Sequence, residues 1–331
     1  MPRLPHAPHQ SINAKMYHLL ALITICIWGT TFVSTKVLLG CGLTPSEIFI
    51  VRFLLAYVGM AAISHQRWRL HTWREEGIAL LAGLTGGSLY FLAENTALEM
   101  APAGYVSFIV CLAPVFTVPL SALRRERDCT FTPHLWAGMA LALMGVFFIA
   151  WGDMDGQSSL SGILLALAAA LLWAVYQNVV GPLTQRYGTA LLTRKVFGYG
   201  LLSMLVLYPL TDTAHRGPEH LFHLLQTVPL SADGLTVWGN LLFLGLIASL
   251  ACYVTWNVVV EKLGAVISAN YIYLNPLTTC LFSALILGET FSLTAALGCV
   301  AILGGVIWAV KCGVVKVSGK EGAGRKHPDS V

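Results

Sequence analysis

The chain has 331 residues, of which 56% are apolar and only 11% are charged. A soluble domain carries about 25% charged residues, so this composition excludes a soluble globular protein and indicates a polytopic membrane protein. The net charge of +4 indicates no nucleic-acid partner, because the basic residues fall in particular loops between apolar runs.

Ten apolar runs follow one another along the chain. A bilayer core about 30 Å thick needs roughly 20 apolar residues per helix, and the runs come close to that length. We therefore predict an all-α integral membrane protein with ten transmembrane helices. The runs are 16–36, 46–64, 76–98, 102–123, 135–152, 161–183, 190–210, 238–260, 265–287 and 293–312.

The distribution of Lys and Arg predicts how these helices are oriented. If the N-terminus is cytoplasmic, 17 basic residues lie on the inner side, and only Lys36 and Arg216 lie in outer loops. We therefore predict a multi-pass protein of the plasma (inner) membrane with a cytoplasmic N-terminal segment, 1–15, and a basic cytoplasmic tail, 314–331. The N-terminal segment has no apolar stretch followed by a cleavage site, so the first run is expected to remain as a helix.

An internal duplication divides the chain. The stretch 82–123 recurs at 244–285, where 11 of 42 positions are identical without a gap. The matches include Pro114 and Pro276, and proline is unusual inside an apolar helix. This recurrence indicates a duplicated pair of helices.

The duplication extends to the rest of each half. Trp28 and Trp173 follow the same Leu-Leu-Ala-Leu sequence at the same spacing, and the fifth and tenth runs share two glycines each. The predicted repeats, 16–152 and 161–313, contain five helices each. Since five is odd, the second repeat must enter the membrane in the opposite orientation, which is the inverted-repeat architecture of many secondary transporters.

Several short motifs stand out along the chain: Trp28-Gly29, Phe32, Lys36, Pro45, Arg52, Pro114, the run from Tyr271 to Pro276, and Gly288-Glu289. Together they resemble the EamA-type branch of the drug/metabolite transporter superfamily. The resemblance implies ten helices in two inverted five-helix repeats, a central cavity and export of small organic solutes. One departure is that Arg124-Arg125-Glu126-Arg127 stands in the first half where the second half has the family-like Gly288-Glu289.

Two prolines are candidate hinges. Pro114 and Pro276 fall near the middle of the fourth and ninth predicted helices, where proline removes a backbone hydrogen bond and leaves the carbonyls of Val110 and Ile272 without their helical partners. Their recurrence in both repeats favours a paired hinge or a break that lines a cavity. The alternative is a static kink filled by neighbouring side chains.

Polar and aromatic side chains that share helix faces are candidates for a solute cavity. Amides inside a membrane are expected to face the bundle interior, and aromatic walls with amides suit a neutral or zwitterionic small molecule. The alternative is that these residues only join and pack the helices. The candidates are Trp28, Phe91, Asn95, Trp173, Tyr176, Gln177, Tyr253, Asn257, Tyr271 and Asn275.

Glu94 lies inside the third predicted helix, about one turn from its outer end, at a depth similar to Lys36 and Arg52. An ionised carboxylate in that position must be paired or exposed to water. An ion pair with Lys36 or Arg52 at the outer rim is one interpretation, and coupling of transport to a proton or another ion is the other. No spacing of His or Cys is typical of a metal site, and no cofactor is expected.

We therefore predict a secondary transporter that exports small amphipathic metabolites, amino acids or drugs by alternating access through a central cavity. Its partners would be a small-molecule solute, the lipid bilayer and a coupling ion such as a proton, with the oligomeric state left open. An exchanger of sugar phosphates or nucleotide sugars remains an alternative. A membrane-embedded enzyme or non-transporting scaffold is the alternative of another class, although the sequence contains no catalytic motif and predicts no enzyme.

Overall fold

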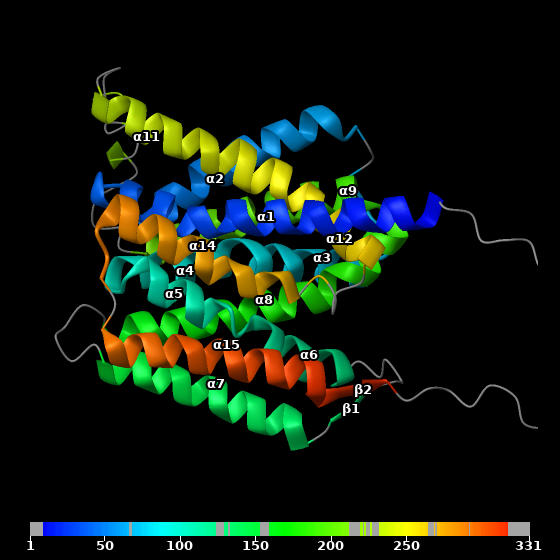
Figure 1. Cartoon of the computed structure of the whole chain (residues 1–331). Helices are drawn as coiled ribbons and strands as arrows, with labels where there is room; N and C mark the ends of the chain where they lie inside the picture. Colours follow the sequence, from blue (N-terminus) through cyan, green and yellow to red (C-terminus); the bar gives the residue numbers. More distant parts are fainter. Residues whose placement is uncertain are drawn as a thin grey trace, which may run out of the picture.

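The computed structural model shows a bundle of roughly aligned helices (Figure 1). It describes residues 9–65, 68–123, 129–131, 133–152, 159–211, 219–220, 222, 226, 232–263, 268, 270–290 and 292–316. Predicted features outside these ranges, including most of the loop 211–237 and of the tail 314–331, are not described further.

The first half of the chain begins with the longest helix. Short π-helical and 3₁₀-helical segments are labelled η. The elements are α1 (His9–Gly40), α2 (Pro45–Ile63), α3 (Trp73–Gly83), η1 (Leu84–Ser88), α4 (Leu89–Met100), α5 (Ala103–Val110), α6 (Ala113–Leu123), β1 (Cys129–Phe131) and α7 (Pro133–Gly152).

The second half contains a similar series. Its elements are α8 (Leu160–Tyr187), α9 (Thr189–Leu207), η2 (Tyr208–Leu210), α11 (Ala232–Leu242), η4 (Phe243–Ala251), α12 (Cys252–Leu263), η5 (Asn270–Leu274), α14 (Asn275–Phe282), η6 (Ser283–Leu287), α15 (Leu293–Gly313) and β2 (Val314–Lys316).

Helices dominate the described part of the chain. Six are long and apolar enough to cross a membrane, and four shorter apolar helices accompany them. The prediction of an all-α protein is confirmed for the described residues, which contain only one small addition, the antiparallel pairing of the short strands β1 and β2. The first three residues of the predicted tail, 314–316, form β2. They pair with β1, which follows α6, and this pairing gives the backbone N–H and C=O groups of both strands hydrogen-bond partners.

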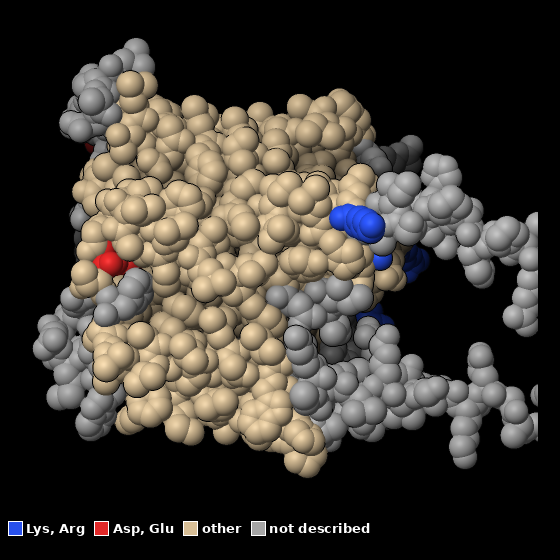
Figure 2. All heavy atoms as spheres, viewed as in Figure 1, with Lys and Arg blue, Asp and Glu red and all other residues tan. Residues whose placement is uncertain are grey.

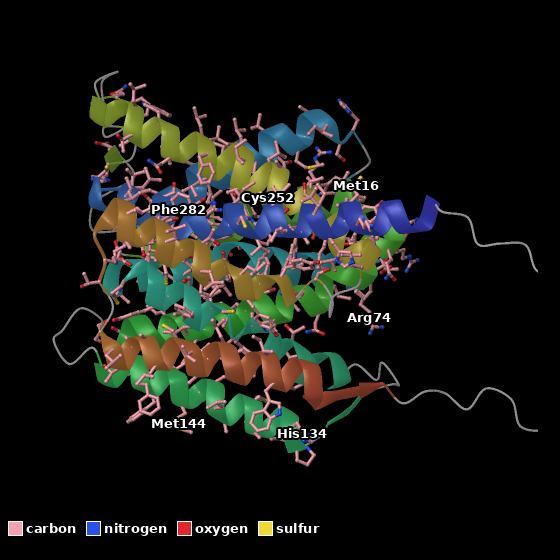
Figure 3. All side chains as sticks on the ribbon, viewed as in Figure 1. Met16, Arg74, His134, Met144, Cys252 and Phe282 are labelled. Atoms are coloured by element: carbon pink, nitrogen blue, oxygen red, sulfur yellow. The ribbon has the colours of Figure 1, made fainter. Side chains whose placement is uncertain are left out.

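Large apolar side chains cover the outside of the bundle. Leu54, Val58, Phe147 and Val206 each expose at least half of their surface, and the labelled Met144 points away from the helices in Figure 3. In a membrane this surface faces lipid, whose tails are as apolar as the side chains themselves. The multi-pass membrane character predicted from the composition follows from these helices.

Glycines bring α7 and α15 into close contact along the lower edge of Figure 1. A Cβ atom built on Gly145 would lie 2.6 Å from the carbonyl oxygen of Gly298, and one built on Gly305 would lie 2.6 Å from that of Gly138. The two contacts run in opposite directions along the helices, so α7 and α15 are antiparallel. Small residues permit this approach because larger side chains would collide.

The remaining helices of the two halves make matching contacts. Helix α1 packs against α12 and α14, while α8 packs against α4 and α6. Gly83, at the end of α3, lies against Tyr199 of α9, and the duplicated Gly245 in η4 lies against Leu55 of α2. Each half therefore supplies the packing partners of the other half.

A π-helical segment interrupts the same place in both duplicated stretches. Segment η1 separates α3 from α4, and η4 separates α11 from α12. In η1, a Cβ atom on Gly86 would lie 2.2 Å from the Tyr176 ring, and Gly87 leaves helical geometry altogether. Close packing on a neighbouring helix therefore coincides with the bulge, and such bulges are frequent at functional sites.

Candidate functional site

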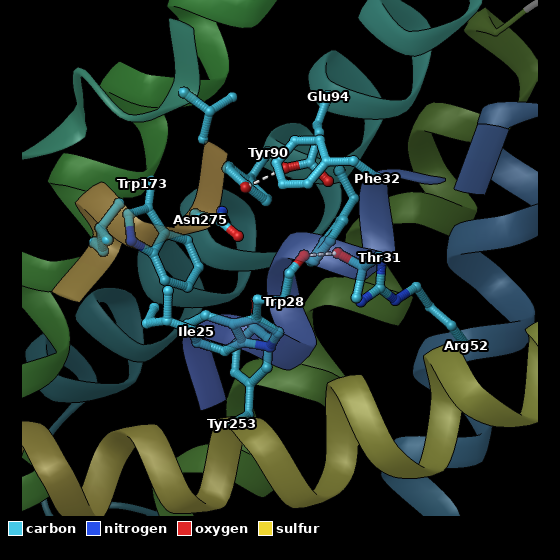
Figure 4. Close-up of a pocket in the computed structure, with 13 residues that line it drawn as sticks. Ile25, Trp28, Thr31, Phe32, Arg52, Tyr90, Glu94, Trp173, Tyr253 and Asn275 are labelled. Atoms are coloured by element: carbon cyan, nitrogen blue, oxygen red, sulfur yellow. Dashed lines mark hydrogen bonds between the residues drawn. The ribbon is translucent and has the colours of Figure 1, made fainter. Parts of the chain in front are cut away.

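A small cavity lies inside the bundle where both halves of the chain meet (Figure 4). Its volume is about 40 Å³, room for roughly three water molecules. Ligand sites run to roughly 300–1,000 Å³, so the cavity is narrow in this conformation. The lining residues are Ile25, Trp28, Thr31, Phe32, Arg52, Tyr90, Phe91, Glu94, Val110, Trp173, Tyr253, Ile272 and Asn275.

Aromatic rings form the wall at one end of the cavity. The ring centroid of Trp28 lies 5.7 Å from that of Trp173 and 5.6 Å from that of Tyr253. Trp28 also donates from Nε1 to the carbonyl oxygen of Ala248 at 2.9 Å, in η4. Tyr253 donates to the carbonyl oxygen of Gly86 at 2.8 Å, in η1. The two π-helical segments therefore hold the aromatic wall in place, since each supplies a carbonyl to it.

Arg52 brings a positive charge into the cavity from α2. Only 1% of the residue is exposed. Its Nε donates to Ser249 Oγ at 2.9 Å, its guanidinium carbon lies 4.2 Å from the centre of the Phe91 ring, and Nη1 has no partner among the described residues. A desolvated cation–π contact contributes about 2 kcal/mol or somewhat more, whereas burying an ion costs several kcal/mol. These contacts therefore leave the charge incompletely compensated.

Glu94 brings a negative charge to the same cavity from α4, and 3% of the residue is exposed. Its carboxylate accepts a hydrogen bond from Tyr90, one helical turn earlier. Of its two possible partners, Lys36 pairs with Glu289 instead. Arg52 is near enough for its charge to interact with that of Glu94, without a direct ion pair among the described residues. The two opposite charges therefore face one cavity without touching.

Both predicted hinge prolines lie at the start of a new helical segment. Pro114 is the second residue of α6, and Pro276 is the second residue of α14, a position that tolerates proline because its N–H would have no helical partner. The carbonyl of Ile272, which Pro276 leaves without a helical donor, accepts from Cys111 Sγ at 3.6 Å. The helix breaks before Pro114 and before Pro276 are therefore in direct contact.

Five predicted candidates are buried or half-buried near the cavity but do not line it. Asn95 donates to the carbonyl oxygen of Pro45 at 3.0 Å, and Asn257 donates to Thr193 Oγ1 at 2.8 Å and accepts from Tyr176 at 3.3 Å. These hydrogen bonds join neighbouring helices, which is the role that the alternative to a solute cavity gave to these amides. Gln177 is buried with no partner among the described residues, and Tyr271 contacts His18 Nδ1 at 2.5 Å.

Comparison with known families accounts for this architecture. The sequence profile of the EamA-like transporter family matches residues 15–151 and, a second time, residues 160–311. The chain belongs to this family. It is therefore a member of the drug/metabolite transporter superfamily, as its motifs predicted.

Relatives of this EamA-like chain carry transporter names. The "Uncharacterized transporter YdfC" of Bacillus subtilis is 28% identical, with 86% of this chain and 87% of the relative covered. The "Probable terminal-alkyne amino-acid exporter" of Streptantibioticus cattleyicolor is 28% identical, with 81% and 84% covered. The "Probable amino-acid metabolite efflux pump" of Salmonella typhimurium is 26% identical, with 87% and 92% covered.

A crystal structure shares the fold of the EamA-like chain. Its TM-score is 0.57 at 19% sequence identity, and the match covers 89% of this chain and 97% of the other. The helical arrangement thus occurs in a protein of distant sequence.

One end of the EamA-like bundle is closed by buried charges, and we call it the Lys195 end. Lys195, which is fully buried, donates from Nζ to the two carboxylate oxygens of Glu76 at 2.9 and 2.7 Å. Tyr199 donates to the same carboxylate at 2.5 Å, and Lys195 Nζ lies 4.6 Å from the centre of the Trp68 ring. This network joins α3 to α9, which belong to different halves of the chain.

The opposite end is closed by a more exposed contact, and we call it the Lys36 end. Lys36 Nζ lies 3.2 Å from Glu289 Oε1, with 28% of the lysine side chain exposed. The same carboxylate accepts from the backbone N–H groups of Ala103 and Gly104 at 2.8 and 3.2 Å, at the N-terminus of α5. The preceding Gly288 has a φ of 66°, a conformation that glycine adopts without strain.

The cavity contains six residues that sequence reasoning did not select. Ile25, Thr31 and Phe32 lie within one helical turn of Trp28, and Tyr90 lies one turn before Glu94, so helical periodicity could have identified them. Val110 and Ile272 each stand four residues before a hinge proline. Within the described residues, no group of three or more potential metal ligands occurs.

Proposed function

We propose that this chain is a secondary transporter that exports small amphipathic solutes, amino acids among them, through the cavity between two inverted five-helix repeats, 16–152 and 161–313. The observation that carries the proposal is the narrow cavity between the two halves of the chain. Both halves of the chain contribute its walls, and an ion pair near each end of the bundle joins the two halves by contacts that can separate. Alternating access requires such a site between two units that tilt against each other.

The proposed inversion of the repeats is supported by the packing. In α7 and α15, the duplicated glycines contact each other reciprocally and in opposite directions. Helices α1 and α8 make equivalent contacts with the third and fourth helices of the other half. Two halves related by a twofold axis in the membrane plane would produce both arrangements.

The proposed orientation places the Lys195 end in the cytoplasm of a cell bounded by the plasma (inner) membrane. On the face shown in Figure 2, Lys and Arg gather where α1 begins, and the middle of that face carries neither sign of charge. Arg74 lies at that same end in Figure 3. Basic residues remain preferentially on the cytoplasmic side of membrane proteins, so the described N-terminal residues would lie there as well.

The proposed movement uses the breaks near Pro114 and Pro276. Val110 and Ile272 line the cavity, and each lies just before the break in its helix. Rotation at these points changes the width of the cavity while the flanking helical segments stay intact. Because a volume of about 40 Å³ is too small for an amino acid, the cavity must widen for a solute to enter.

A phosphorylated sugar or nucleotide suits the cavity less well. A dianionic phosphate requires several cationic donors, and Arg52 is the one Lys or Arg among the described lining residues, where it shares the cavity with Glu94. An enzyme is also less well supported, because family and relatives are transporters and the lining is mostly aromatic and apolar.

The test is efflux of radiolabelled leucine from proteoliposomes containing the purified chain. We expect Trp173→Ala to lower the initial rate about tenfold or more, because Trp173 contributes to the aromatic wall on which a solute would pack. Trp73→Ala is the matched control, since Trp73 is 88% exposed, and it should leave the rate unchanged. Failure of the wild-type chain to move leucine or other amphipathic solutes across the membrane would refute the proposed function.

A further inference from the structure

The cavity contains two opposite buried charges that interact at a distance but form no direct ion pair among the described residues. Arg52 approaches from α2 and Glu94 from α4, and Figure 4 shows both side chains extending to the same cavity. Helix packing alone would be served better by direct pairing or by apolar residues. A third feature of the site is Asn275, whose Oδ1 is buried with no partner among the described residues.

Arg52 has the properties of a carboxylate-binding residue. Its Nε is used by Ser249, and Phe91 covers the guanidinium plane. Nη1 remains without a partner among the described residues while the residue is 1% exposed. A guanidinium group donates several hydrogen bonds in a rigid plane that matches a carboxylate, so an anionic group in the cavity would complete its contacts.

Glu94 and Asn275 have the complementary chemistry. An ionised carboxylate only accepts hydrogen bonds, and the described contacts of Glu94 use one donor, Tyr90. Asn275 contributes a second unpaired acceptor on the same cavity. An ammonium group carries three donors and no acceptor, and it is also attracted to the faces of neighbouring rings such as Trp28.

We propose that this site recognises the zwitterionic head of an α-amino acid, with its carboxylate at Arg52 and its ammonium group at Glu94 and Asn275. The inference rests on the proposed function in that it takes the cavity as the solute site. A solute with both charges leaves neither protein charge unpaired. A solute with only a cation or only an anion leaves one of them uncompensated, so the site selects against both.

The experiment measures binding of four leucine-sized compounds to the purified full-length chain by isothermal titration calorimetry. Leucine carries both charges, 3-methylbutan-1-amine only the ammonium group, 4-methylpentanoate only the carboxylate, and N-acetyl-leucinamide neither. We expect leucine to bind at least tenfold more tightly than each of the other three, because each lost charge removes charge-assisted hydrogen bonds. Equal or tighter binding of the amine or of the carboxylate would overturn the inference.

Two variants assign the charges to their residues. In Arg52→Gln, leucine and 3-methylbutan-1-amine should bind within about twofold of each other, because the carboxylate no longer has a partner. In Glu94→Gln, the same should hold for leucine and 4-methylpentanoate. The control is Lys262→Gln, whose lysine is exposed and lies outside the cavity, and it should keep the wild-type preference. Retained preference in both cavity variants would also overturn the inference.

The result is distinguishable from failure of the transport proposal. Proteoliposome efflux of leucine and of N-acetyl-leucinamide at equal rates, without charge preference in binding, would leave the transporter intact and remove the zwitterion site. Selective binding of leucine without any efflux would keep the site and remove the transport proposal. If Arg52→Gln fails to fold, the four compounds on the wild-type chain decide the question alone.

Discussion

The two ends of the bundle are closed in different ways. At the Lys195 end, a fully buried lysine, a carboxylate with 15% of its side chain exposed and two aromatic rings form one network. At the Lys36 end, the lysine is 28% exposed and the carboxylate also accepts from the first N–H groups of α5. The carboxylates of the two ends are similarly buried, whereas the lysine is fully buried at one end and partly exposed to water at the other.

This difference predicts which end separates more easily. Water can reach the partly exposed Lys36 and replace its partners as the contact opens. Lys195 is fully buried, so separating it from Glu76 requires water to enter and hydrate both charges at once. Breaking a buried pair costs far more than breaking an exposed one. We therefore expect the closed state to open more readily at the Lys36 end than at the Lys195 end.

The largest effect is expected for Lys195→Met. Removing the lysine leaves the Glu76 carboxylate with only its neutral donors, so the free energy of unfolding should fall by about 3 kcal/mol. The measurement is unfolding of the purified chain by titration with SDS. The double variant Lys195→Met with Glu76→Gln should recover more than half of that loss, because no charge then remains unpaired. A loss below about 1 kcal/mol in the single variant would remove the distinction between the ends.

A smaller effect is expected for Glu289→Gln. The amide still accepts one hydrogen bond from the start of α5, but it loses the ion pair with Lys36 and the interaction of a negative charge with the helix dipole, so the free energy of unfolding should fall by about 1 kcal/mol. The Lys36 end should also open more often. Mass spectrometry would then show faster maleimide labelling of a cysteine introduced as Thr31→Cys in the cavity, and an unchanged rate would contradict this expectation.

The smallest effect is expected for Lys262→Met, at the same end of the bundle as Lys195. Lys262 pairs with the adjacent Glu261 at 2.7 Å, but 46% of the lysine side chain is exposed. Lys262 and Lys195 therefore lie at the same end of the bundle but differ in burial, and we expect only burial to affect the free energy of unfolding. We expect no measurable change in SDS unfolding. A loss comparable to that of Lys195→Met would show that location at this end is sufficient.

The sequence selected several residues that line the cavity, because their residue type restricts their surroundings. Trp28, Phe91, Trp173, Tyr253 and Asn275 were selected for the cavity and line it, because large or polar side chains on shared helix faces have few other places to go inside a membrane. Prediction was weaker for charge pairing. Lys36 contacts Glu289, which is 253 residues away in the chain, and no local pattern indicates such a distant partner.

The amino-acid sequence alone determined the membrane class, the family and the duplication, because composition, motifs and repeats are properties of the chain in order. The tertiary structure decided which buried groups meet: Asn95 and Asn257 join helices, whereas Arg52 and Glu94 face the cavity without pairing. It also placed the π-helical segments, where Gly86 packs on Tyr176. The physical reason is that close contact and charge compensation depend on partners brought together from distant parts of the chain.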